Sequence, residues 1–221
     1  MVIMIARLWP LFRRNVRLYS DAVKIRGTML LTTTVVFLLA RRQSFTDLFS
    51  GVIQCGAFTM PLTWLFLVMS PLMVVGDAAT RLFKVEYPLV SHVSLRVYLA
   101  TIQVLVAASD LAFWGVWFVL ASGWQALGFS LTVLLLTIVI TEAYSLAQLF
   151  AGPIAALLGS LGLLIITVAC NHFPLLSALM ASRYPQVSWP QTLLALVLVA
   201  VAAFFSTTQL YQLDFMRTDA R

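Results

Sequence analysis

The sequence predicts an all-α polytopic membrane protein with six transmembrane helices. Hydrophobic residues make up 62% of its 221 residues and charged residues only 10%, against about 25% charged residues in soluble domains. The apolar stretches are continuous, whereas the strands of a membrane barrel alternate apolar and polar residues. Because one helix needs about 20 apolar residues to cross a hydrocarbon core of about 30 Å, these stretches suffice for about six helices.

The positive charge of the chain points to a membrane surface rather than to nucleic acid. The formal net charge is +6, but the basic residues lie at the ends of apolar stretches, where they set orientation and contact anionic lipid headgroups. The two cysteines, Cys55 and Cys170, lie in separate apolar stretches, and no group of metal ligands accompanies them. We therefore expect the lipid bilayer as a partner, no nucleic acid, and no metal site or cofactor in this chain.

Residues 1–26 predict a cytoplasmic amphipathic helix that lies in the membrane interface. Their apolar residues recur at the spacing of one helical stripe, and the arginines lie off that stripe. The stripe consists of Ile5, Leu8, Trp9, Phe12, Val16 and Tyr19. A helix with one apolar face and an arginine-rich remainder is typical of the interface. The alternative is a basic tail that only sets the topology.

The transmembrane domain, residues 27–213, is expected to contain the six spans, the first of which begins slightly earlier. Their approximate ranges are 22–42, 53–75, 97–121, 128–150, 154–171 and 190–211. The first span has a short uncharged run, 27–40, which is only about 21 Å long at 1.5 Å per residue. Its flanking basic side chains must therefore reach the headgroups, or the helix lies shallow and tilted.

Residues 172–189, between the fifth and sixth spans, are expected to lie on the outer side of the membrane as a re-entrant segment. Leu175, Leu176, Leu179 and Met180 make this connection too apolar for a simple loop, and it is too short to span. It is expected to form a short amphipathic helix that dips into the outer leaflet. Residues 214–221 form a polar tail.

The basic residues also predict the orientation of the chain. With six spans and a cytoplasmic N-terminus, only Arg41, Arg42 and Arg183 of the 14 Lys and Arg residues fall on the outer side. Cytoplasmic loops carry the excess of Lys and Arg in membrane proteins. We therefore expect a multi-pass protein of the plasma (inner) membrane with both termini in the cytoplasm.

Residues 77–96 are a charged segment between two apolar spans and are expected in the cytoplasm. Asp77 and Arg81 stand one helical turn apart, and Leu82, Phe83 and Val85 form a small apolar group among the charges. This pattern favours a short helix on the membrane surface that offers a face to a protein. The alternative is an ordinary loop that separates two spans.

Three stretches of the chain resemble a known family of transporters. They are 11–19 near the N-terminus, 82–88 in the charged segment and 94–100 at the start of the next span. Together with the layout of spans, they look like the membrane subunit of an ABC exporter of the class that moves O-antigen, capsular polysaccharide, peptides and drugs. The chain is shorter than typical polysaccharide permeases. The resemblance implies outward transport of a substrate by a permease that is not itself an enzyme.

The resemblance also implies partners. In such exporters the helix after the second span is the coupling helix, which docks on a cytoplasmic ATPase subunit. On this sequence the coupling residues would be Arg81, Leu82, Phe83, Lys84, Glu86 and Tyr87. The chain has no Gly-x-x-x-x-Gly-Lys-Ser/Thr phosphate loop, so ATP and Mg are expected on a separate ATPase chain. A second permease copy, as a homodimer, or a related permease would complete the assembly.

Asp110 and Glu142 are the acids placed well inside the predicted spans, and no Lys or Arg lies at a matching depth. An ionised carboxylate at the bilayer centre costs about 2.5 kcal/mol or more, so such residues commonly face a cavity or a partner. They are candidates for the translocation path, or else they form hydrogen bonds between helices. They also leave open an ion- or proton-coupled secondary carrier. A non-transport integral membrane protein, such as an intramembrane enzyme or an assembly factor, is a third alternative.

Overall fold

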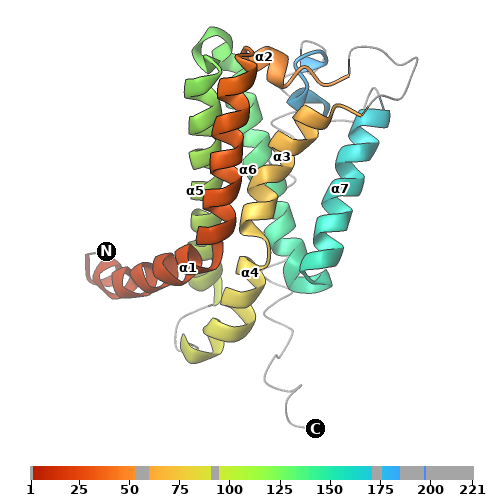
Figure 1. The fold of residues 1–221 in the computed structure, drawn as a ribbon. Helices are drawn as coiled ribbons and strands as arrows, with labels where there is room; N and C mark the ends of the chain where they lie inside the picture. The colour runs from red at the N-terminus through yellow and green to blue at the C-terminus, as the bar shows by residue number, and fades with distance from the viewer. Residues whose placement is uncertain (1, 53–59, 91–94, 171–175, 185–196, 198–221) are drawn as a thin grey trace.

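The computed structural model describes residues 2–52, 60–90, 95–170, 176–184 and 197. Across these residues the chain is helical, with no strand, and the predicted all-α class is confirmed for them (Figure 1). The α-helices are α1 (Val2–Arg41), α2 (Phe45–Leu48), α3 (Leu62–Val75), α4 (Ala78–Arg81), α5 (Leu95–Leu120), α6 (Leu127–Ala151) and α7 (Pro153–Ala169). The short π- and 3-10 helices are η1 (Leu82–Glu86), η2 (Tyr87–Val90), η3 (Gly123–Ala126) and η4 (Leu176–Leu179).

Four stretches of helix are long and apolar enough to cross a bilayer. They are Trp9–Arg41, Leu62–Leu89, Val97–Leu120 and Gly123–Ala151, and α7 is a shorter apolar helix. Helices α5 and α6 match the predicted spans 97–121 and 128–150 closely. The predicted sixth span, 190–211, falls almost entirely outside the described residues. The first residues of the predicted second span and the tail 214–221 also fall outside them.

Helices α1, α3, α5, α6 and α7 stand side by side in a bundle, with α4 at one end and α2 at the other (Figure 1). We call these ends the base and the top. The bundle is held by one large apolar core, which includes Trp64 and Leu72 of α3, Trp117 of α5 and Leu136 of α6. Because these side chains come from three helices, the core fixes the helices against one another.

Helix α1 corrects the prediction of two separate elements at 1–26 and 22–42. It is one helix of 40 residues that contains Pro10 without interruption. At 1.5 Å per residue it is about 60 Å long, roughly twice the hydrocarbon thickness. Its first part accordingly runs across the base, and the remainder rises along α5 (Figure 1). Tyr19 of the predicted apolar stripe is buried in the bundle, whereas Trp9 and Val16 are exposed.

Residues 77–90, which we call the base segment, continue the chain in helical form beyond α3. Asp77 precedes α4, and η1 and η2 follow without a gap as far as Val90. This part of the chain is therefore helical, while its place on the membrane surface and its contact with a protein stay predictions. The predicted coupling segment extended to residue 96, and its residues 91–94 lie outside the described part of the chain.

Residues 176–184, which we call the top segment, belong to the connection 172–189 that is predicted to dip into the outer leaflet, and their depth in a membrane stays a prediction. Leu176, Leu179 and Met180 are buried against the protein. The indole Nε1 of Trp64 donates to the carbonyl oxygen of Leu179 at 3.0 Å. The segment therefore closes the top of the bundle.

Arg183 of the top segment caps the end of α7. Its guanidinium donates to the carbonyl oxygens of Thr167 at 2.6 Å, of Val168 at 3.1 Å and of Cys170 at 3.1 Å. The last carbonyls of a helix have no partner within the helix, and a cation at that end also complements the helix dipole. Arg183 is 6% exposed, so its charge is satisfied by buried protein oxygens.

Candidate functional site

Two ion pairs attach the base segment to α1. Arg14 Nη2 lies 2.6 Å from Glu86 Oε2, and Arg26 Nη1 lies 2.8 Å from Asp77 Oδ1. All four side chains remain partly exposed, so each pair contributes about 1 kcal/mol or less to stability. These ion pairs fix the position of the base segment, because they join Asp77 and Glu86 to one helix.

Gly76 forms the joint between α3 and the base segment. Its φ of 49° lies in the left-handed region that favours glycine. A Cβ at this position would collide with the guanidinium of Arg26, so the glycine also makes room for the Arg26–Asp77 ion pair. On the other side, the hydroxyl of Tyr144 on α6 donates to the carbonyl oxygen of Gly76 at 2.9 Å. The joint is thus fixed by α1 and α6 together.

Two of the three residues of the predicted apolar group, Leu82 and Phe83, are buried within the chain. Leu82 is 2% exposed and Phe83 is 3% exposed. Tyr98 of α5 donates to the carbonyl oxygen of Leu82 at 2.8 Å, and Leu82 belongs to the main core. Phe83 packs in a second core with Leu95, Leu99, Leu146 and Leu149. The base segment therefore turns these two side chains toward α5 and α6, and their role as coupling residues stays a prediction.

A different set of side chains on the base segment is exposed. Arg81, Lys84, Val85 and Leu89 are exposed, Val85 by 59% and Leu89 by 71%. They follow one another at spacings of three, one and four residues, which places them on one side of a helical turn. We call these four residues the outward face. It combines two positive charges with two apolar side chains.

The remaining predicted coupling residues lie between these two faces. Glu86 is half-buried and paired with Arg14. Tyr87 is half-buried, and its ring stacks on that of Phe83 with centroids 5.9 Å apart. Of the six residues, Arg81 and Lys84 are therefore fully available to a partner. Leu89 was missed by the sequence reasoning, although its spacing of four residues from Val85 was a usable signal.

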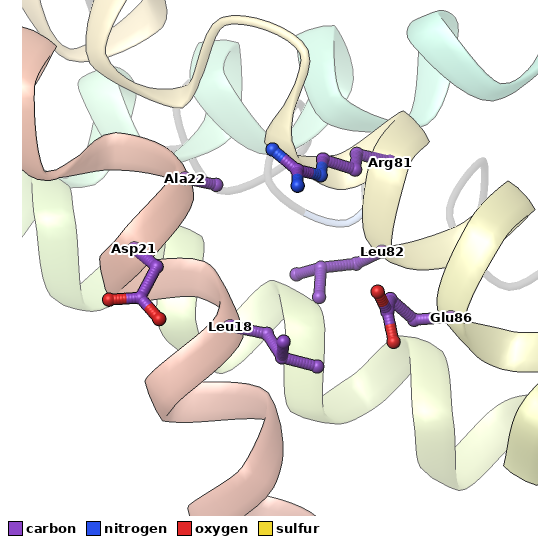
Figure 2. A pocket seen from close by; sticks show the side chains of 6 residues that line it. All are labelled: Leu18, Asp21, Ala22, Arg81, Leu82 and Glu86. Atoms are coloured by element: carbon purple, nitrogen blue, oxygen red, sulfur yellow. The ribbon is translucent and has the colours of Figure 1, made fainter.

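A pocket of about 180 Å³ lies between α1 and the base segment. Figure 2 shows Leu18, Asp21 and Ala22 on the α1 side, opposite Arg81, Leu82 and Glu86. The pocket has two carboxylates and one guanidinium at its rim. This mixture of charges favours neither an anion nor a cation, so the pocket defines no ligand class.

The second site is a polar cluster inside the bundle around Asp110 of α5. Asp110 is fully buried, and its Oδ1 lies 3.1 Å from Oγ1 of Thr141 on α6. The predicted hydrogen bond between helices is therefore present for this acid. The other oxygen, Oδ2, has no hydrogen-bond partner among the described residues, and the same is true of Oε2 of the adjacent Glu142.

Helix α1 contributes to the same region through polar side chains that the sequence reasoning did not single out. Tyr19 OH lies 2.9 Å from Ser109 Oγ, one residue before Asp110. One turn earlier, Asn15 Nδ2 donates to Thr101 Oγ1 at 2.8 Å. Asn15 and Tyr19 are four residues apart, so they lie on one helical face. That spacing could have indicated a polar contact between α1 and another helix.

No metal centre can be built from the described residues, where no three His, Cys, Asp or Glu side chains lie close enough together. Comparison with protein-family models, with curated proteins and with solved structures finds no match for this chain. The fold therefore defines the class of the protein only coarsely, as a helical bundle whose long apolar helices suit a membrane.

Proposed function

We propose that this chain is the permease subunit of an ABC exporter in the plasma (inner) membrane. In this proposal the base and both termini are cytoplasmic, and a separate ATPase subunit binds ATP and Mg. A second permease copy, or a related permease, completes the transport path. The proposal rests on the sequence resemblance and on the shape of the base segment.

The observation that carries the proposal is the outward face of the base segment. Val85 and Leu89 are exposed beside Arg81 and Lys84, on a helical segment at the end of the bundle where the basic N-terminal part of α1 lies (Figure 1). A pair of apolar side chains ringed by charges is typical of a small docking surface, where the apolar groups supply affinity and the charges supply orientation. The positive charges favour a groove with acidic residues at its rim.

The attachments of the base segment suit it to transmit motion. It is joined to α1 by Arg26–Asp77 and to α5 by Tyr98. It is joined to α6 by Tyr144 through Gly76 and by Thr80, whose hydroxyl lies 3.4 Å from the carbonyl oxygen of Gln148. A displacement of the outward face would therefore be passed to three long helices. An ATPase that binds nucleotide could bias two arrangements of these helices through this one segment.

The test is to purify the full chain from its own membranes in mild detergent and to identify what accompanies it. The proposal expects a protein with a Gly-x-x-x-x-Gly-Lys-Ser/Thr phosphate loop, and ATP hydrolysis by the purified complex. An ATPase variant with the phosphate-loop lysine replaced should bind the permease but hydrolyse no ATP. A chain that purifies without any such protein, at full recovery and from several detergents, would contradict the proposal.

A second candidate is a proton- or ion-coupled carrier, which the buried Asp110 and its neighbour Glu142 favour. Such a carrier would move its substrate in vesicles that contain this chain alone and an ion gradient. The exporter would move its substrate only when the ATPase and ATP are present. Transport by vesicles with and without the ATPase therefore separates the two candidates.

A further inference from the structure

The hydroxyl groups around Asp110 lie within hydrogen-bond distance of backbone oxygens. Thr141 Oγ1 lies 2.9 Å from the carbonyl oxygen of Thr137, closer than the 3.1 Å to Asp110 Oδ1. Ser109 Oγ lies 3.2 Å from the carbonyl oxygen of Leu105. A hydroxyl has one proton and two acceptor positions, and a carbonyl oxygen can only accept. The shorter contact of Thr141 lies within its own helix, so we assign its proton to the carbonyl oxygen of Thr137, which leaves a lone pair of Thr141 Oγ1 for Asp110.

Tyr19 OH lies 2.9 Å from Ser109 Oγ, and either hydroxyl can be the donor of this hydrogen bond. In the described part of the chain neither Tyr19 nor Ser109 forms a hydrogen bond with Asp110, and Thr141 is the partner of Oδ1. An ionised Asp110 would need donors at both oxygens, and it is fully buried with Oδ2 unpartnered among the described residues.

The charged groups nearby do not supply the missing interaction. Glu142 follows Thr141 in the chain, and an ionised carboxylate there can only accept hydrogen bonds. Arg26 acts on Tyr19 but is paired with Asp77 at the base. In the part of the chain that the structure describes, neither Asp110 nor Glu142 belongs to an ion pair.

We propose that Asp110 is a proton-binding site inside the bundle, in which the protonated Oδ1 donates to Thr141 Oγ1 across the contact between α5 and α6. A protonated Asp110 can donate to the free lone pair of Thr141 Oγ1 while Thr141 keeps its own donation to Thr137. Loss of this proton leaves a buried carboxylate with Oδ2 unpartnered among the described residues, and Thr141 must then turn its own proton from Thr137 to Asp110 to keep the hydrogen bond between the two helices. The ligand is a proton, and the site is independent of the proposed ATPase partner.

The test is infrared spectroscopy of the purified full chain in lipid nanodiscs at neutral pH. A protonated carboxylic acid has a C=O stretching band that an ionised carboxylate lacks and that shifts in D₂O. This band should be present in the wild type and should lose intensity in Asp110→Asn. It should keep its intensity in Asp47→Asn, which removes an exposed acid at the top. A wild-type spectrum without the band, or a band unchanged in Asp110→Asn, overturns the proposal.

Thr141 provides a second test in which Asp110 stays in place. Thr141→Val removes the acceptor of the proposed proton with little change in volume, and the carboxylic acid band should move. Thr141→Ser keeps the hydroxyl and should leave the band where it is. A band that stays in place in Thr141→Val overturns the assignment of the proton to this contact, even where Asp110→Asn does not fold.

Discussion

The base segment and the top segment are two short stretches in which apolar and charged residues are mixed. They differ in which of these side chains are buried against the bundle. In the top segment Leu176, Leu179 and Met180 are buried, and Arg183 is buried with them. In the base segment Leu82 and Phe83 are buried, but Val85 and Leu89 are exposed. The top segment therefore seals the bundle, whereas the base segment both seals it and keeps a second face for contact.

The contrast shows why an apolar group among charges does not by itself identify a docking surface. In both segments the bundle covers several apolar residues, and in the base segment it leaves Val85 and Leu89 exposed. The surface available to a partner consists of the side chains that remain when the core is complete. The predictions below begin with the changes expected to reduce folding stability most and end with the one expected to reduce it least.

The largest loss of stability is expected for a buried residue of the base segment, and an exposed residue of the same segment is the comparison. Leu82→Ala should lower the free energy of unfolding by about 2–5 kcal/mol, because it opens a cavity in the core. Val85→Ala should change it by less than about 0.5 kcal/mol, because Val85 is exposed. SDS titration of the purified chain measures both. Equal values for the two variants would mean that the two faces are not distinct.

Arg183→Met should be the most damaging change in the top segment that leaves the apolar core intact. It removes the donor to three buried carbonyl oxygens at the end of α7. The expected loss is about 3 kcal/mol, since buried groups left unsatisfied cost about 1–3 kcal/mol each and part of this is recovered by relaxation. Arg17→Met, at an exposed arginine of α1, is the control and should be close to neutral. A neutral Arg183→Met would show that the capping contributes nothing.

Gly76→Ala should destabilise the joint above the base segment by about 1–3 kcal/mol, through backbone strain and the displaced Arg26. Gly159→Ala on α7 is the matched control. There an added Cβ meets nothing within 4 Å, and alanine is the better helix former by about 1 kcal/mol. Thermal unfolding should therefore place the two variants on opposite sides of the wild type. A Gly76→Ala variant as stable as Gly159→Ala would contradict this account of the joint.

The ion pair between Arg14 and Glu86 should contribute about 1 kcal/mol or less, because both side chains are partly exposed. A double-mutant cycle of Arg14→Gln and Glu86→Gln measures the coupling directly. Salt should weaken it further, since exposed pairs are screened. A coupling well above 1 kcal/mol that resists salt would mean that the pair is more enclosed than its exposure indicates.

Features that depend on neighbouring residues could be predicted from the sequence, whereas features that depend on contacts between distant residues could not. Helices α5 and α6 were located to within about two residues, because uninterrupted apolar runs bounded by polar residues define them. The burial of Leu82 and Phe83 was not predictable, because it depends on contacts with Tyr98 of α5 and with leucines of α5 and α6, some of which are distant in the sequence. In the same way Asp110 stood out by its charge, but its partner Thr141 lies 31 residues away.

The central proposal is that the outward face binds the ATPase, and one pair of variants tests it most directly. The double variant Val85→Ser, Leu89→Ser should keep the stability of the wild type yet lose the ATPase on affinity purification. The loss should exceed tenfold per mole of folded chain, because apolar anchors of a docking surface contribute about 2 kcal/mol each.

The matched control is Val119→Ser, Leu120→Ser, a pair of exposed apolar residues at the end of α5 toward the top. This variant should retain the ATPase at the wild-type level. The account predicts that only the base variant loses the partner while both remain folded. Full recovery of the ATPase with the base variant would contradict it.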